Sequence, residues 1–180
     1  LRSLPSMTTA SMSIQGENTV PPPPSWRLML SHPAHQVSFG FGSGLIRPAP
    51  GTWGTLFAWL VFVVLDPWLG DAGWAIVIAT TFVLGAAAAH RTGRALGRPD
   101  HGAIVIDEIV AFWLVLWLLP GGVITQAVAF LGFRFFDILK PPPIRAVDRR
   151  FKNGVGVMLD DLLAAFYTLL VASVLARVFA

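Results

Sequence analysis

Five carboxylates in three separate segments have the chemistry of a divalent-cation site. The segments are IVIDEIVAFW, FRFFDILK and VMLDD, and the acids are Asp107, Glu108, Asp137, Asp160 and Asp161. Oxygen-rich sites suit hard cations, and magnesium is the natural occupant of this one. Acids near a helix start can instead complement the helix dipole, which explains one acid better than two adjacent ones. If the three segments meet in space, the pattern predicts a magnesium site.

Cationic side chains stand close to these acids in the sequence. Arg134, Asp137 and Lys140 are spaced three residues apart, which puts them on one face of a helix. They could form a local series of ion pairs near the membrane interface, or they could serve a site. His101 lies in a turn close to Asp107 and is a candidate acid or base beside a bound substrate.

A second charged group follows the three prolines at 141–143. Guanidinium groups fit phosphate oxygens well, so these residues are candidates for binding a phosphomonoester headgroup. The same charges could simply hold lipid phosphates on the cytoplasmic side of a membrane. The residues concerned are Arg145, Asp148, Arg149 and Arg150.

The composition is that of an integral membrane protein. Hydrophobic residues make up 54% and charged residues 13% of the 180 residues, against roughly 25% charged residues in ordinary soluble domains. The absence of cysteine excludes disulfides, zinc–thiolate sites and cysteine nucleophiles. The net charge of +3 comes without a Lys/Arg-rich face for nucleic acid, so anionic lipid is the expected partner.

The chain divides into a polar tail and an apolar domain. Residues 1–25 are rich in Ser, Thr and Pro and are predicted to be disordered, whereas residues 26–180 form the membrane domain. Residues 26–41 are expected to form a short interfacial helix or loop, and residues 40–55 are too rich in Gly and Pro for a long helix. Arg47, together with the Pro, Gly and Thr residues at 48–54, could form a loop over the site or only the entry to a helix.

Five apolar segments predict an all-α, polytopic membrane bundle of about four to five helices. Several are shorter than the ~20 residues of a perpendicular span, so either the bilayer adapts or some helices are buried in protein. The segments are residues 54–69, 74–96, 104–119, 123–138 and 158–179.

Short connections make neighbouring helices antiparallel, and this gathers the charges at one end of the bundle. Residues 91–108, 134–152 and 160–161 all reach one side, while Asp66, Asp71 and Arg177 reach the other. The positive-inside rule predicts that the charged side is cytoplasmic. Polar segments that are far apart in the sequence are therefore expected to meet, as an active site requires.

Four motifs in one order carry a family resemblance: GFGSGLIRPAPGTWGT, DHGAIVIDEIVAFW, FRFFDILKPPPI and DRRFKNGVGVMLDD. Over about residues 40–165 the chain resembles the phosphatidylglycerophosphatase A family. The resemblance implies a magnesium-dependent lipid phosphatase of the bacterial inner membrane, which converts phosphatidylglycerophosphate to phosphatidylglycerol and inorganic phosphate. The family's motif acids fall on the five carboxylates, and its motif cations on Arg134, Lys140, Arg145 and Arg149, with Asp148 beside them.

The chain departs from the family pattern at two positions. Ala111 and Ala165 stand where glycine usually follows the acid pairs, which predicts looser helix packing with the chemistry intact. A small transporter and a non-catalytic lipid-binding protein are the alternative functions, although a transporter should carry charge in mid-helix and a lipid binder needs no acids. Direct attack by water is favoured over an aspartyl-phosphate intermediate, and the oligomeric state stays open.

Overall fold

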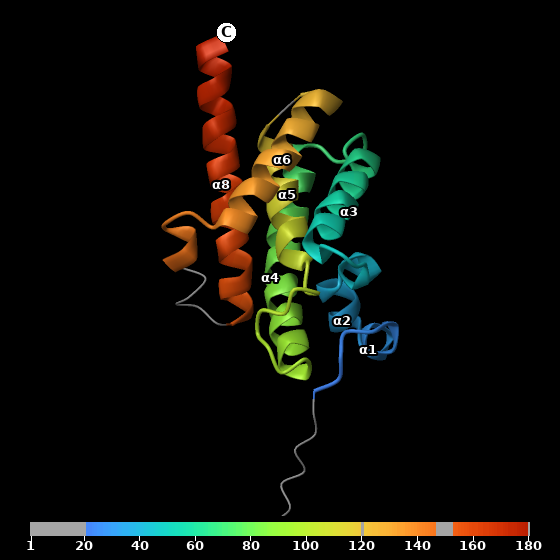
Figure 1. Ribbon diagram of the computed structural model, residues 1–180. Helices are drawn as coiled ribbons and strands as arrows, with labels where there is room; N and C mark the ends of the chain where they lie inside the picture. The colour runs from blue at the N-terminus through green and yellow to red at the C-terminus, as the bar shows by residue number, and fades with distance from the viewer. Residues whose placement is uncertain (1–20, 120, 147–152, 180) are drawn as a thin grey trace, which may run out of the picture.

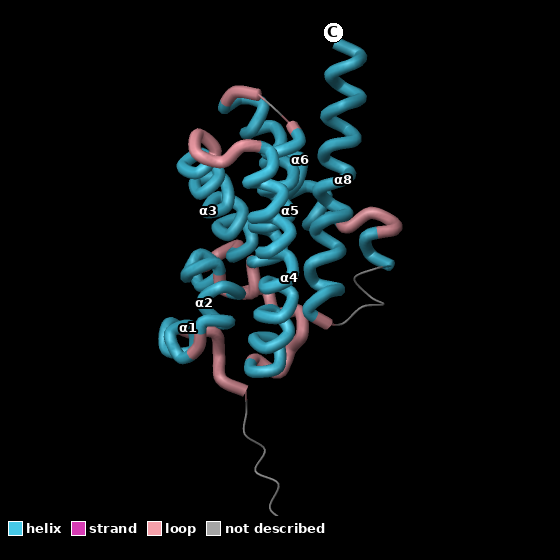
Figure 2. Tube along the Cα trace, turned by 180° about the vertical axis from the view of Figure 1, so that it is seen from behind, coloured by secondary structure: helices cyan, strands magenta, loops and turns pink. Residues whose placement is uncertain are grey.

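The chain is a bundle of helices in the computed structural model, which describes residues 21–119, 121–146 and 153–179 (Figure 1). The elements are α1 (Trp26–Ser31), α2 (Pro33–Ser38), the 3₁₀ helix η1 (Gly40–Leu45), α3 (Pro50–Leu65), α4 (Asp71–Ala95), α5 (Ile106–Leu118), α6 (Val123–Leu139) and α8 (Gly154–Phe179). No strand occurs in these described ranges, so the all-α prediction is confirmed (Figure 2). Most of the predicted tail, residues 1–20, lies outside the described residues, and its disorder stays a prediction.

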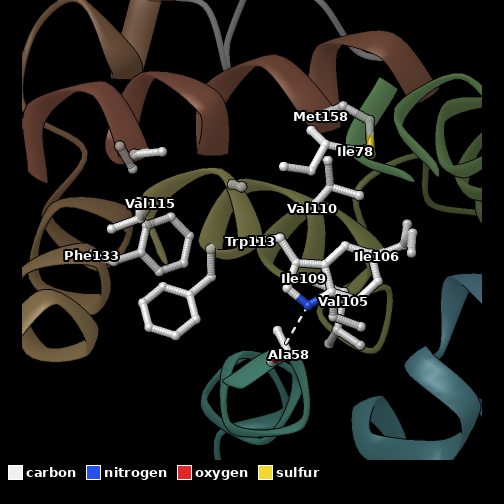
Figure 3. Close-up of a cluster of buried hydrophobic side chains, with 14 of the residues drawn as sticks. Ala58, Ile78, Val105, Ile106, Ile109, Val110, Trp113, Val115, Phe133 and Met158 are labelled. Carbon is white, nitrogen blue, oxygen red and sulfur yellow. Dashed lines mark hydrogen bonds between the residues drawn. The ribbon is translucent and has the colours of Figure 1, made fainter. Parts of the chain in front are cut away.

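The central element is α5, which packs against α3, α4, α6 and α8. Its apolar residues face all directions, so the helix is buried on every side. Val110, Phe112 and Val115 are fully buried, and Phe133 of α6 and Met158 of α8 close over them (Figure 3). The indole N–H of Trp113 donates to the carbonyl of Ala58 at 2.9 Å, which ties α5 to α3.

The two alanines that replace family glycines lie inside this core. Ala111 of α5 and Ala165 of α8 are both 0% exposed and belong to the same cluster of buried side chains. Both methyl groups therefore lie within the contacts between the helices, and the looser packing relative to glycine stays a prediction.

Two of the described helices, α4 and α8, are long and apolar enough to cross a membrane. By contrast α3, α5 and α6 have 16, 13 and 17 residues, short of the ~20 of a perpendicular span. The prediction of four to five membrane spans is therefore not confirmed, because only two of the described helices have the length and composition of a span. Large apolar side chains on the outside of the bundle, such as Leu60, Ile76, Val128 and Phe166, are more than half exposed. Apolar patches on that scale are expected of a membrane protein.

Two helices begin four residues earlier than the sequence predicts, and α4 begins three residues earlier, at Asp71. The first is α3, which starts at Pro50 because proline suits the first helical position, and Ala49 makes the preceding turn in a left-handed conformation with φ of 58°. The second is α8, where the side chain of Asn153 accepts a hydrogen bond from the N–H of Gly156 at 2.9 Å and caps a helix that starts at Gly154.

The early start of α8 depends on a close helix contact. A Cβ at Gly154 would lie 2.1 Å from the carbonyl oxygen of Ala86, so only glycine lets the first turn of α8 approach α4. Asp160 and Asp161 consequently lie in the second turn of α8. The predicted start of this segment at residue 158, which would put Asp160 and Asp161 in the first turn of the helix, was wrong, because the glycines at 154 and 156 are themselves part of the helix.

Candidate active site

Three acids from two helices converge at the polar end of the bundle. Asp107 and Glu108 come from the first turn of α5 and Asp161 from α8, and one oxygen of each lies within 4.8 Å of the others. Asp107 is 8% exposed and Asp161 is 3% exposed. Buried carboxylates at this spacing repel one another unless a cation lies between them. This acid cluster, Asp107–Glu108–Asp161, has the geometry of a metal site.

The other two predicted acids border the cluster and are paired with cations. Asp137 Oδ2 lies 2.5 Å from Nη1 of Arg134, and Asp160 Oδ2 lies 2.5 Å from Nζ of Lys140. Asp160 also acts electrostatically on Asp107, and Asp137 acts on Glu108. All five carboxylates therefore lie in one region of the bundle, but Asp137 and Asp160 form ion pairs with cationic side chains of the chain itself.

The acid cluster keeps buried oxygens that accept no hydrogen bond from the described residues. They are Oε2 of Glu108 and Oδ2 of Asp161. Buried polar atoms are nearly always satisfied, so two acceptors that lie among other acids fit a bound cation. Every ligand atom here is a carboxylate oxygen, and such a set fits a hard divalent ion better than a soft one.

The start of α3 presses directly on the cluster. A Cβ at Gly51 would lie 2.2 Å from Glu108 Oε1 and 3.0 Å from each terminal nitrogen of Arg134. Arg134 Nη1 is itself 3.7 Å from Glu108 Oε1. Within the segment left open as a loop or a helix entry, the residues from Pro50 onward are therefore the start of α3, which packs against the site. The sequence alone did not indicate that Gly51 would contact Glu108 and Arg134.

Burial changes the protonation of the acids on α5. Burial, the neighbouring Glu108 and then Asp161 raise the pKa of Asp107 well above its usual range. Burial also raises the pKa of Glu108 to about 7, with the charge of Asp137 adding to the effect. Without a cation, these two acids hold protons at a pH where exposed carboxyls are ionised.

This pKa predicts a pH-dependent stability difference for Glu108→Gln. Unfolded Glu108 titrates near 4.5 and the folded residue near 7, so its ionisation destabilises metal-free protein as the pH rises through that window, by up to about 3 kcal/mol. Glutamine removes this cost. Thermal melts of both proteins in EDTA should agree near pH 4.5, with the variant more stable at pH 8. A difference that does not change with pH would contradict the raised pKa.

Arg134 is expected to hold the metal-free site together. Its side chain is 13% exposed and lies between Glu108 and Asp137. Removing one partner of a buried ion pair typically costs about 3 kcal/mol or more, because the acids lose their counter-charge. Arg134→Gln should therefore lower the melting temperature clearly at pH 8, whereas Arg177→Gln, at an exposed position of α8, should leave it unchanged. Equal melting of the two variants would argue against this role.

The remaining predicted site residues lie around this centre. Lys140 ends α6 in a left-handed conformation with φ of 45° and directs its amine to Asp160. Arg145 is exposed, and its Nη2 donates to the carbonyl of Leu139 at 3.3 Å. His101 Nδ1 accepts a hydrogen bond from the N–H of Ala103 at 3.1 Å.

The structure does not test the predicted role of His101 or the predicted headgroup contacts of the residues at 148–150. Burial, then Arg98 and Arg47, lower the pKa of His101, and the acid cluster is not among the charges that act on it. Its role as an acid or base stays a prediction. Asp148, Arg149 and Arg150 lie outside the described residues, so their predicted contacts with a headgroup also stay predictions.

Comparison with known proteins identifies the family of the chain. The phosphatidylglycerophosphatase A family matches residues 36–176. The chain belongs to this family. It is 45% identical over 150 residues to phosphatidylglycerophosphatase A of Haemophilus influenzae, covering 82% of this chain and 91% of that protein. It is 39% identical over 142 residues to phosphatidylglycerophosphatase A of Escherichia coli, covering 77% and 80%. No solved structure matches the chain.

The phosphatidylglycerophosphatase A match includes every element of the site. It begins within α2 and ends near the end of α8, so α3, α5 and α6 lie wholly inside it. Helix α1 and the residues before it lie outside. The acid cluster is thus part of the segment that the family shares.

Proposed function

We propose that this chain hydrolyses phosphatidylglycerophosphate to phosphatidylglycerol and inorganic phosphate, with Mg²⁺ held by Asp107, Glu108 and Asp161. Membership of the phosphatidylglycerophosphatase A family supports the substrate. The observation that carries the metal site is the convergence within 4.8 Å of three carboxylates, two of them buried and Glu108 partly buried. A simple lipid binder needs no such cluster, and a transporter should carry its charges in mid-helix rather than at one end of the bundle.

The protein's own residues hold the phosphate and the charges around it. Asp107, Glu108 and Asp161 would hold a divalent ion, which when bound would supply Lewis-acid chemistry and lower the pKa of a water molecule. Arg134 and Lys140 lie at the border of the cluster and stabilise negative charge on the phosphoryl oxygens. Asp137 and Asp160 position these two cations through their ion pairs. Arg145, Arg149 and Asp148 bind the headgroup from the segment that follows α6.

Attack by water, rather than by a carboxylate of the chain, completes the proposal. If a carboxylate were the nucleophile, a phosphorylated enzyme would form during turnover. Enzyme mixed with radiolabelled substrate and quenched in acid should carry no label on the protein. Label on the protein in the amount of active enzyme would contradict direct attack.

We assign the chain to the bacterial inner membrane, with α4 and α8 crossing it and the site on the cytoplasmic face. The positive-inside rule supports this orientation, because Arg91, Arg94 and Arg134 lie near the site end of the bundle. The other end has Asp66 and Asp71, which accept hydrogen bonds from Trp74 and Trp117. α3 and α6 are embedded beside the spanning helices, where the bilayer adapts to their shorter length.

Phosphate release by purified protein tests the function. Detergent-solubilised protein should release inorganic phosphate from phosphatidylglycerophosphate with Mg²⁺ and lose this activity in excess EDTA, with recovery when Mg²⁺ is added back. Phosphatidic acid at the same concentration serves as a comparison monoester. Absence of release with Mg²⁺ would overturn the proposal and favour a lipid-binding role.

A further inference from the structure

The C-terminal half of α4 carries a cationic cavity that the proposed reaction does not use. The cavity has a volume of about 450 Å³ and is lined by His35, His90, Arg91, Arg94 and Ala95. Arg91 and Arg94 are exposed, and neither forms an ion pair with the residues that the structure describes. No carboxylate belongs to this lining. The cavity therefore presents uncompensated positive charge.

A buried polar chain fixes one wall of the cavity. His35 is 6% exposed, and its Nδ1 lies 2.8 Å from the hydroxyl of Thr92. Thr92 donates to the hydroxyl of Ser38 at 2.9 Å, and both hydroxyl residues are fully buried. The carbonyl of Ser38 accepts a hydrogen bond from the N–H of Val105 at 2.8 Å. The imidazole is thus held in place by the loop that leads into α5.

An apolar groove adjoins the cationic cavity. It has a volume of about 490 Å³, and the residue common to both is His90. Phe82, Val83, Ala86 and Ala87 of α4 form one side, and residues 153–155 at the start of α8 form the other. α4 and α8 run side by side here (Figure 1). The groove lies on the membrane side of the arginines, because α4 runs from its apolar middle toward its charged end.

The cationic cavity and the apolar groove together are complementary to a phospholipid in size and polarity. Val83 and Arg94 are separated by roughly 16 Å along the helix, about the distance from a headgroup phosphate to the middle of an acyl chain. Arginine guanidinium groups suit phosphate oxygens, and an apolar groove suits a chain. None of the five site carboxylates lines either cavity.

We infer that this cavity and groove form a second lipid site, which binds an anionic membrane phospholipid with its phosphate at Arg91 and Arg94 and one acyl chain between α4 and α8. The site is separate from the acid cluster and does not depend on catalysis. A lipid held there ties the start of α8, and with it Asp160 and Asp161, to the end of α4. The inference rests on membrane placement and goes beyond the proposed phosphatase activity.

Lipid binding in micelles tests the inference directly. Native mass spectrometry of delipidated protein in a neutral detergent should detect saturable binding of phosphatidylglycerol and at least tenfold weaker binding of phosphatidylcholine. The double variant Arg91→Gln/Arg94→Gln should weaken phosphatidylglycerol binding at least tenfold. The control Arg98→Gln, at an exposed position on the same end but outside both linings, should bind as the wild type does.

A groove variant and inorganic phosphate separate a lipid from a free anion. Ala87→Trp fills the groove and should weaken binding of a long-chain phosphatidylglycerol more than binding of its short-chain form. Inorganic phosphate at millimolar concentration should not displace the lipid. Displacement by phosphate would overturn the lipid assignment in favour of a free-anion site. Unchanged lipid binding by the double arginine variant, with its melting temperature preserved, would overturn the site itself.

Discussion

Asp161→Asn is expected to lower phosphate release from phosphatidylglycerophosphate by about 1000-fold, a loss typical of removing a group that stabilises developing charge. Asp161 is almost completely buried, and it supplies the only ligand from α8 to the three-acid cluster. Asparagine keeps the size of the side chain but removes its charge. Initial rates at the Mg²⁺ concentration that saturates the wild type measure the loss, and raising the Mg²⁺ concentration further should recover part of it if the main defect of the variant is metal affinity.

The matched control for this variant is Asp71→Asn. Asp71 begins α4 at the opposite end of the bundle and accepts a hydrogen bond from Trp117, which an amide oxygen can also accept. The control should keep its rate within about twofold. If Asp161→Asn kept full activity while folding normally, the assignment of the metal site would be wrong.

Gly51→Ala is expected to reduce turnover by about 100-fold, because displacing catalytic groups by about 1 Å can cost that much. The added methyl would fall on Glu108 Oε1 and close to both terminal nitrogens of Arg134. Either the carboxylate leaves the cluster or the start of α3 moves away. The kinetic measurement should give a lower kcat, and the Mg²⁺ concentration for half-maximal rate should rise.

The control for this steric effect is Gly102→Ala. No heavy atom lies within 4 Å of a Cβ built at Gly102, and its φ is not in the left-handed region. The control should retain wild-type turnover and Mg²⁺ dependence. If the two glycine variants behaved alike, the close approach of α3 to Glu108 would not matter for catalysis.

Much of the candidate site could be predicted from the sequence, because the chain has few charged residues. With long apolar segments joined by short turns, the helices must alternate in direction, and this brings the start of α5 and the start of α8 to the same end. Asp107, Glu108 and Asp161 meet there as predicted. The spacing of Arg134 and Asp137 also predicted one helical face, and their ion pair confirms it.

The parts that could not be predicted depend on contacts between helices. The sequence does not reveal that Gly154 approaches the backbone of α4, and so α8 was predicted to begin four residues later than it does. The ion pair between Lys140 and Asp160 depends on how α6 and α8 pack against each other. The positions of the two residues in the sequence do not indicate that their side chains meet. Apolar periodicity also does not distinguish a spanning helix from a buried one, as α5 illustrates.

Manganese binding followed by electron paramagnetic resonance tests the central claim most directly, because it reports on the acid cluster without catalysis. Free Mn²⁺ gives a sharp six-line spectrum that is lost when the ion is bound. Wild-type protein should bind at least one Mn²⁺ per chain, and Mg²⁺ should compete for it. Asp107→Asn should abolish this binding, whereas Asp71→Asn should not. Undiminished binding by a folded Asp107→Asn protein would contradict a metal site at Asp107, Glu108 and Asp161.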